Sequence, residues 1–277
     1  MSDIREKRPI DKFNMTMNIM IVAFVVILVV SVAILIYRIN IYRIGKSTYT
    51  KLADKYAKEV ESSEDQVEKA SKNNKADNSM KDPKVFLSKA PIQVDFDGLL
   101  RLNKDVQGWL YQPKTGINYP VMKTDDNNYY LHHMIDGKYN YSGTLFIHCN
   151  NKADFEDYNT VIYGHNMKNG TMFGTIDNYD DENYYRAHPV FYYLTPEKNY
   201  RLDVYSGYVA PKKSDSYQID FKSDKEYEIF KRTLYDRSAF NSYIELEEVD
   251  KSVTLSTCAY DFKDARFVVH ANLVEID

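Results

Sequence analysis

The most hydrophobic part of this 277-residue chain is a continuous apolar run near its N-terminus. Residues 19–37 read IMIVAFVVILVVSVAILIY, without a charge and with Ser31 as the one clearly polar side chain. As a helix this run would cover about 28 Å, close to the ~30 Å hydrocarbon layer of a bilayer. A buried helix of a soluble protein normally carries a polar stripe, so the pattern predicts a helix that spans a membrane.

A cleaved signal peptide is the alternative interpretation of the same run. Ser31-Val32-Ala33 resembles a small-x-small cleavage site. The apolar residues 34–36 continue beyond that site, which favours an uncleaved anchor. Basic residues flank the run on both sides, so charge alone does not orient the span.

Residues 38–85 have the pattern of a spacer. Leu52, Tyr56 and Val60 recur at four-residue steps, which predicts a helical first half that leans on the membrane or on the following domain. The second half is polar and charged, and its composition predicts little packed structure. Such a spacer would hold a folded head away from a surface.

From residue 86 onward the pattern changes to short apolar or alternating runs separated by Gly, Asn, Asp and Pro. These runs are typical of strands at the spacing of a β-barrel. They lie at residues 108–111, 119–122, 143–148, 160–163, 202–209, 252–255 and 266–276. Helical periodicity is confined to residues 96–103, 172–179 and 225–235. The head is therefore expected to be a mainly β domain with a few packed helices.

Composition removes several classes of protein from consideration. The chain is 44% hydrophobic and 27% charged, as in ordinary globular proteins, so wholesale disorder is excluded. Its 36 Lys and Arg against 40 Asp and Glu give a net charge of −4, so nucleic acid is not an expected partner. Two cysteines are too few for a disulfide framework, and no histidine pair has metal-ligand spacing. We expect neither a metal nor a cofactor.

The best candidate nucleophile is Cys258. Residues 252–255 alternate as a strand and Ser256-Thr257-Cys258 closes it, so the thiol would lie where a strand meets a loop. The chain resumes an apolar run at Arg266, and a hairpin would bring this side chain beside Cys258. A guanidinium is permanently charged and forks its donors, so it would favour a thiolate or hold an oxyanion. A surface ion pair is the ordinary alternative for such an arginine.

Cys149 is a weaker candidate nucleophile. It ends the strand-like run 143–149, where a free cysteine usually serves as a small buried hydrophobe. Its neighbour His148 would point to the opposite face of a strand and would be a poor base for it.

His165 has the most informative context of the six histidines. It follows the apolar residues 161–163 in a turn that contains Gly164 and Gly170, a position exposed for proton transfer. The remaining candidates are interpreted as solvated or structural imidazoles: His132, His133, His188 and His270. Of these, His270 shares strand parity with Arg266 and could line the same face.

These motifs resemble a known family. Residues 254–258, TLSTC, match the TLxTC signature of sortases, the cell-wall cysteine transpeptidases of Gram-positive bacteria. Arg266 falls where the catalytic arginine of that family follows the cysteine. Similarity to class B sortases rests on residues 118–121 (NYPV), 127–131 (NNYYL) and 162–173 (IYGHNMKNGTMF). The resemblance covers roughly residues 88–277.

The resemblance implies a sortase-type eight-stranded β-barrel with added helices, preceded by one transmembrane helix and a partly helical spacer. Residues 225–235 would form the long helix that class B members add before the cysteine strand. The implied layout is a cytoplasmic tail at 1–18, the anchor at 19–37, the spacer at 38–85 and an extracellular catalytic domain at 86–277. The expected location is the cell membrane, crossed once.

The resemblance also implies a mechanism. Cys258 attacks the Thr carbonyl of a sorting signal on a surface protein, His165 protonates the departing amine, and Arg266 stabilises the oxyanion. A peptidoglycan cross-bridge or precursor amine then resolves the thioacyl enzyme, and water hydrolyses it when no amine is present. Five positions match the groove that binds the sorting peptide: Asn127, Leu131, Tyr217, Ser256 and Thr257. Gln218 and Ala259 depart from the family pattern, which leaves the sorting motif open.

Two other functions fit the same residues. A Cys-His cell-wall hydrolase or protease would use the same nucleophile and base but let water finish the reaction. A non-catalytic stalked surface module would carry Cys258 only as a buried thiol, which should resist alkylation.

Overall fold

The computed structural model describes residues 12–60 and 89–277, with side chains from Met15 onward. The chain divides into two units, residues 1–44 and Gly45–Asp277. The expected cytoplasmic tail lies partly, and the second half of the spacer almost wholly, outside the described residues.

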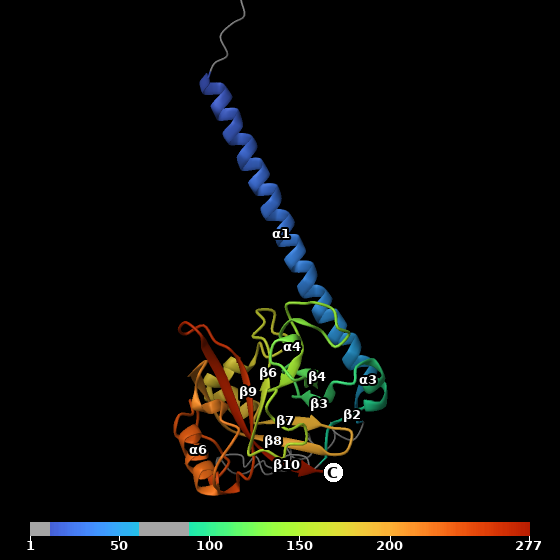
Figure 1. The fold of residues 1–277 in the computed structure, drawn as a ribbon, viewed down its shortest axis with the longest axis vertical. Coiled ribbons are helices and arrows are strands. Elements are labelled where there is room, and N and C mark those ends of the chain that lie inside the picture. Colours follow the sequence, from blue (N-terminus) through green and yellow to red (C-terminus); the bar gives the residue numbers. More distant parts are fainter. Residues whose placement is uncertain (1–11, 61–88) are drawn as a thin grey trace, which may run out of the picture. The chain divides into compact units, whose positions relative to one another are not determined.

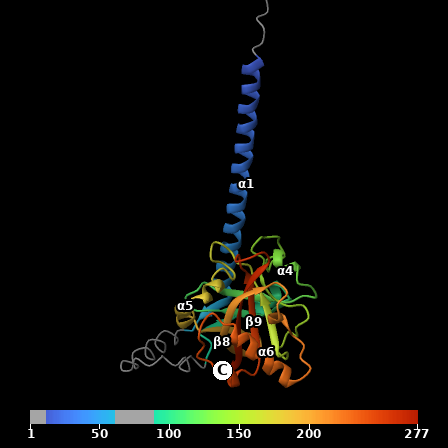
Figure 2. The same cartoon turned by 90° about the vertical axis from the view of Figure 1, so that its left-hand side faces the viewer.

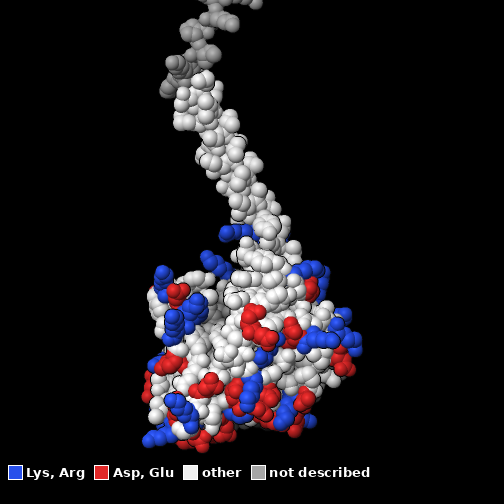
Figure 3. All heavy atoms as spheres, in the orientation of Figure 1, with Lys and Arg blue, Asp and Glu red and all other residues white. Residues whose placement is uncertain are grey.

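A single helix, α1 (Lys12–Tyr56), carries the apolar run (Figure 1). From Met15 onward this helix is long and apolar enough to cross a membrane. Its most apolar 18-residue window has a mean hydropathy of 3.5, and no residue of that window is buried. Figure 3 shows the apolar part of this helix as an uncharged surface, whereas Lys and Arg are interspersed with Asp and Glu over the visible face of the head.

The C-terminal part of α1 belongs to the head. Tyr49, Leu52 and Tyr56 are buried in the main hydrophobic cluster, and the Tyr49 hydroxyl donates to Gly143 O at 2.7 Å. The prediction that Leu52 and Tyr56 lie on one packed helix face is therefore confirmed, with the head as the partner. Val60 lies past the helix end and is 38% exposed. The folded head thus includes part of the segment expected to be a spacer.

Eight strands close into a barrel in the order β10-β8-β7-β3-β4-β5-β6-β9, which confirms the predicted fold class. They are β3 (Val106–Tyr111), β4 (Asn118–Met122), β5 (Leu145–Ile147), β6 (Asn159–Tyr163), β7 (Val190–Leu194), β8 (Asn199–Pro211), β9 (Ser252–Cys258) and β10 (Ala265–Ile276). A separate antiparallel pair joins β1 (Ala57–Glu59) to β2 (Ile92–Val94).

Short helices surround the barrel (Figure 2). They are α3 (Phe96–Leu102), α4 (Tyr129–His132), η2 (Ile176–Asp180), α5 (Glu182–Ala187), η3 (Asp215–Tyr217), α6 (Asp224–Asp236) and η4 (Leu246–Glu248). The expected long helix is α6, which begins where the Ser223 hydroxyl caps Glu226 N. Its buried residues Tyr227, Phe230 and Leu234 recur at helical spacing and form a second core with Val268 of β10.

Two expectations about elements are wrong. The helix predicted at residues 172–179 is limited to a 3-10 helix from Ile176, because Met172 has a positive φ of 54° and bridges back to Asn166. Strand β7 was not predicted. All five of its residues are buried, so its sequence has no apolar-polar alternation to reveal it.

Alternation along β9 separates the barrel interior from the catalytic face. Val253 and Leu255 point into the main core, whereas Thr254, Ser256 and Cys258 share the opposite face. This outer face is the one that the second core around α6 covers farther along the strand, since Val268 of β10 pairs with Ser256. The outward-facing side chains of β9 are therefore buried at Thr254 and Ser256 and become accessible at Cys258, where the strand ends.

Candidate active site

The three candidate catalytic residues lie at the ends of adjacent strands. Cys258 ends β9 and is the direct register partner of Arg266 on β10, as the hairpin interpretation predicts. On its other side β9 runs parallel to β6, with Ser256 opposite Tyr163 (Figure 1). His165 follows Tyr163 by two positions, just as Cys258 follows Ser256.

Two hydrogen bonds tie the His165 turn to the cysteine strand. The Thr257 hydroxyl donates to Gly164 O at 2.9 Å, and Asn166 Nδ2 donates to Cys258 O at 2.8 Å. The same Asn166 nitrogen donates to Asp177 Oδ2 at 2.8 Å. The residues on either side of His165 are therefore hydrogen-bonded to the end of the strand that carries the thiol.

The imidazole of His165 has a defined orientation. Its Nε2 lies 2.7 Å from Leu131 O. Because a carbonyl oxygen only accepts, Nε2 must carry a hydrogen, which leaves Nδ1 as the nitrogen that can exchange a proton. The Leu131 carbonyl thus fixes the orientation and the tautomer of the His165 ring, as an aspartate carboxylate does for the histidine of a catalytic triad.

Burial lowers the pKa of His165 below its usual value. The Leu131 carbonyl acts in the opposite direction, because it accepts a hydrogen bond from the charged ring, whereas the nearby His132 lowers the pKa further. The ring centroids of His132 and His165 are 6.0 Å apart. The site therefore favours a neutral imidazole that is ready to accept a proton.

Arg266 contributes a positive field to the groove. Its Nη1 donates to Ala265 O at 2.8 Å, and the side chain is half-buried. Burial raises the pKa of Tyr163 and Tyr217, and the charge of Arg266 opposes that rise at both hydroxyls. The Arg266 guanidinium therefore acts on two groove tyrosines, and its residue pairs in register with Cys258.

Tyr217 and Ser256, both predicted to line the groove, lie together. Their hydroxyls are 2.9 Å apart, and the Tyr217 ring lies 6.1 Å from that of Tyr163. Tyr217 belongs to residues 214–218, which we term the groove loop. Tyr163 was not singled out from the sequence, because the long-range pairing of β6 with β9 has no local signal.

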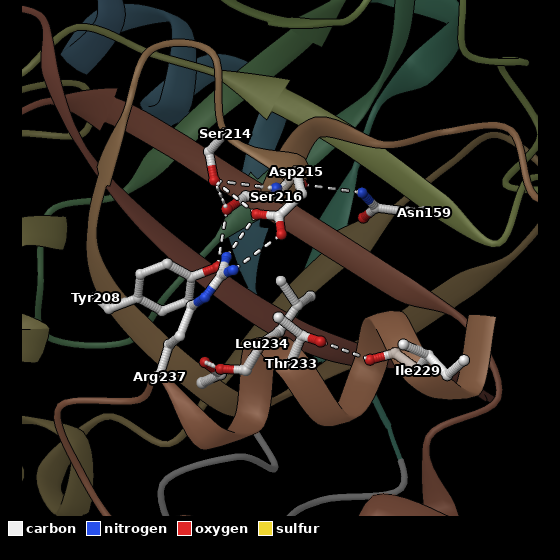
Figure 4. Close-up of polar contacts among 10 residues, drawn as sticks. Asn159, Tyr208, Ser214, Asp215, Ser216, Ile229, Thr233, Leu234 and Arg237 are labelled. Atoms are coloured by element: carbon white, nitrogen blue, oxygen red, sulfur yellow. Dashed lines mark hydrogen bonds and ion pairs between the residues drawn. The ribbon is translucent and has the colours of Figure 1, made fainter. Parts of the chain in front are cut away.

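The groove loop is fixed by polar side chains from the barrel and from α6 (Figure 4). Arg237 pairs with Asp215, with Nη2 donating to Oδ2 at 2.9 Å. The hydroxyls of Tyr208 and Ser216 are 2.8 Å apart. Asn159 Nδ2 donates to Ser216 O and to Gln218 O, at 3.3 and 2.9 Å.

Asn127 and Leu131, also predicted to line the groove, make different contacts. Asn127 Oδ1 accepts from Cys149 N at 2.8 Å, which turns its amide donors away from that backbone. Leu131 is half-buried, and its carbonyl holds His165. Leu131 therefore contacts a catalytic candidate directly, a positioning contact that the sequence did not reveal, whereas Asn127 contacts Cys149.

The structure does not bring every candidate to the groove. Thr257 lies on the opposite pleat from Cys258 and its hydroxyl donates to Gly164 O, so its side chain supports the His165 turn instead. His270 does share the Arg266 face, but it is fully buried and its Nδ1 bonds the Thr254 hydroxyl at 2.9 Å. Burial lowers the pKa of His270 to about 3, which keeps it neutral.

Cys149 differs from its expected description. It lies in a turn after β5, not in the strand, and it is half-exposed instead of buried. Both Cys149 and Cys258 are free thiols.

The arrangement can perform nucleophilic acyl transfer. It has an accessible thiol at a strand end, an imidazole with one oriented proton-exchanging nitrogen, and a fixed cation. Among residues 12–60 and 89–277, no group of three His, Cys, Asp or Glu could hold a metal ion.

Comparison with known proteins gives one consistent result. Residues 110–274 match the family model of the sortase domain. The chain is 34% identical over 187 residues to sortase B of Listeria monocytogenes, covering 66% of this chain and 75% of that protein. It is 29% identical to sortase B of Staphylococcus aureus, covering 67% and 77%.

Solved structures agree with the sequence comparison. Sortase B of B. anthracis in complex with AAEK1 matches with a TM-score of 0.59 and 33% identity, over 68% of this chain and 87% of that one. Sortase B of S. aureus matches with a TM-score of 0.65 and 26% identity, over 84% of this chain and 100% of that one.

Proposed function

Because the chain belongs to the sortase family and is a class B sortase, we propose that it cleaves a sorting signal through a thioacyl enzyme on Cys258 and transfers the surface protein to a cell-wall amine. The observation that carries the proposal is the junction of three strand ends. Cys258 pairs with Arg266 in register, and the His165 turn is hydrogen-bonded to Thr257 and to Cys258 O.

In the first half-reaction Nδ1 of the neutral His165 takes the proton of the Cys258 thiol, and the sulfur attacks the carbonyl carbon of the scissile residue. Arg266 stabilises the resulting oxyanion, since a guanidinium placed before the reaction needs no reorganisation as charge develops. His165 delivers the proton from Nδ1 to the departing amine as the C–N bond breaks. The product is a thioester between the surface protein and Cys258.

In the second half-reaction the acceptor amine attacks the thioester. His165, now neutral, takes a proton from the amine at Nδ1 while the Leu131 carbonyl keeps the ring in place. The C–S bond breaks, the new amide leaves, and Cys258 is regenerated. When no amine is present, water attacks the same thioester and gives a free acid. A lowered pKa of His165 favours the neutral form that this step requires.

The layout of the chain follows from the same proposal. The apolar run of α1 anchors the protein in the cell membrane, and the catalytic head lies outside the cell, where sorting signals and cell-wall amines meet. The sorting peptide lies between the groove loop and the Asn127–Leu131 side of the site. Asn127, Leu131, Tyr217 and Ser256 contact it, and Thr257 supports the strand beneath it.

The test uses the full chain in detergent with LPxTG-like and NPxTN-like peptides, with and without an amine-bearing peptide. We expect an amide-linked product when the amine is present and free acid when it is absent. Cys258→Ala should abolish both products, whereas the matched control Cys149→Ala should retain them. Turnover by Cys258→Ala would refute the nucleophile. Free acid alone, even at high amine concentration, would make the enzyme a hydrolase.

A further inference from the structure

Four aromatic side chains form a surface outside the proposed peptide groove. Tyr129, His133, Tyr139 and Tyr141, which we term the aromatic platform, are linked ring to ring. Tyr129 stacks on His133 at 4.2 Å, His133 meets Tyr139 edge-on at 6.0 Å, and Tyr139 meets Tyr141 at 5.7 Å. The three tyrosines are 40%, 56% and 41% exposed. Single exposed aromatics are common on proteins, but a contiguous group usually marks a binding surface.

The aromatic platform is held in shape by its backbone. His133 and Tyr139 form an antiparallel bridge, and Met134 N donates to Lys138 O at 2.9 Å. The turn between them requires Gly137, which has a φ of 76°. The Thr144 hydroxyl donates to His133 O at 2.8 Å. A surface ordered in this way loses little conformational entropy when a ligand binds.

The aromatic platform continues into the catalytic site through His132. The His132 ring lies 6.0 Å from Tyr139 and 6.0 Å from His165. Leu131 of α4 contacts His165 through its carbonyl, while Tyr129 and His133 stack on each other in the aromatic platform. The same short segment of chain therefore contacts the catalytic imidazole and forms part of the aromatic platform.

The direction of proton transfer assigns a ligand to this surface. His165 donates a proton to the leaving amine and accepts one from the incoming amine, so both must be on the His165 side of the thioester. The acyl portion of the sorting peptide occupies the opposite side, with Arg266 and Tyr217. The aromatic platform adjoins His165 through the His132 ring, so an acceptor bound there would lie next to the catalytic imidazole.

We propose that the aromatic platform is the binding site for the acceptor, and that it recognises a peptide that carries a free amine. The inference rests on the proposed transpeptidase function. Tyrosine faces attract an ammonium group and stack on the planar amides of a short peptide. The groove loop selects the sorting peptide, and the aromatic platform selects the acceptor amine that takes the place of the leaving group.

The test compares two acceptors on the full chain in detergent. The donor is a sorting peptide that ends one residue after the scissile bond, so that its leaving group cannot reach the aromatic platform. The acceptors are a short peptide with a free N-terminal amine and hydroxylamine, which is too small to contact the tyrosines. For Tyr139→Ala/Tyr141→Ala we expect kcat/KM for the peptide amine to fall about tenfold, the loss expected for two aromatic contacts. The hydroxylamine reaction and hydrolysis should keep their wild-type rates.

Two controls accompany the double variant. Tyr139→Phe keeps the ring and should transfer normally. Ile229→Ala removes an equally exposed apolar side chain from α6 and should have no effect. Thermal denaturation of each variant checks that the fold is intact.

Unchanged transfer to the peptide amine, or an equal loss with hydroxylamine, would overturn the proposal. So would a loss seen only when the enzyme is in liposomes, since the aromatic platform would then be a membrane contact. If the wild-type enzyme forms no amide with any amine, the proposed function itself fails. If the wild-type enzyme and the double variant transfer equally well to the peptide amine, the acceptor site is wrong but the proposed function stands.

Discussion

The groove loop and the aromatic platform adjoin different parts of the catalytic site and are built in different ways. The groove loop contacts Ser256, whereas the aromatic platform reaches His165 through His132. The groove loop is held by polar side chains, among them the Asp215–Arg237 pair and the Asn159 amide. The aromatic platform is held by backbone hydrogen bonds and leaves its rings exposed. The polar anchors of the groove loop fix the position of Tyr217 from several directions, whereas the platform presents a flat surface with few directional contacts.

This difference matches the two substrates in the proposed reaction. A sorting signal must be distinguished from other peptides, and directional polar contacts give that discrimination because an unpaired buried polar group is costly. An acceptor needs mainly to be close to His165 with its amine deprotonated. Stacking surfaces give proximity with little selectivity. We therefore expect damage to the groove loop to weaken peptide binding and damage near the platform to alter the second half-reaction.

The largest effect is expected beside the groove loop, at Arg266, which pairs in register with Cys258. Arg266→Lys keeps a positive charge but loses the forked donors, so kcat for peptide cleavage should fall about 100-fold or more. Steady-state cleavage of the sorting peptide measures this. Thermal stability should change little, because the side chain is only half-buried. A variant with near-normal kcat would remove Arg266 from transition-state stabilisation.

An intermediate effect is expected from the groove loop. Asp215→Ala frees Arg237 and loosens residues 214–218 without touching the catalytic side chains, so KM for the sorting peptide should rise about fivefold while kcat is retained. Lys198→Ala breaks a similarly exposed ion pair with Glu275 far from the groove loop and serves as the control. A fall in kcat at constant KM would show that the pair supports the chemistry instead of the groove.

The smallest effect is expected on the platform side, from His132. His132 lowers the pKa of His165, so His132→Gln should raise that pKa toward its usual value while burial still holds it down. The limb of the pH profile of kcat/KM that reports His165 should therefore move to higher pH. His188→Gln, which changes a histidine that does not act on His165, should leave the profile in place. An unmoved limb in His132→Gln would show that the two imidazoles are not coupled.

Local patterns in the sequence predicted much of this molecule. The apolar run, the α6 helix and the hairpin that pairs Cys258 with Arg266 all depend on residues close together in the chain. Period-2 alternation in β9 and the loop length before Arg266 were enough to set that register. The eight-stranded barrel came from family resemblance, because periodicity alone indicates strands but not their order.

The parts that could not be predicted depend on contacts between distant segments. Tyr163 meets Ser256 through a parallel pairing between residues about 90 positions apart, and Leu131 O reaches His165 across 34 positions. His132 was interpreted as an ordinary imidazole because nothing near it in the chain indicates His165 as a neighbour. Thr257 was expected in the groove on the basis of a motif, but strict alternation next to Cys258 directs its side chain inward.

The most direct test of the account is the mass of the enzyme after it reacts with a sorting peptide in the absence of an amine. We expect a covalent adduct on Cys258 that adds the mass of the N-terminal acyl fragment of the peptide, and hydroxylamine should release this fragment as a hydroxamate because the link is a thioester. An adduct on Cys149, or continued peptide cleavage with no adduct at Cys258, would contradict the thioacyl mechanism.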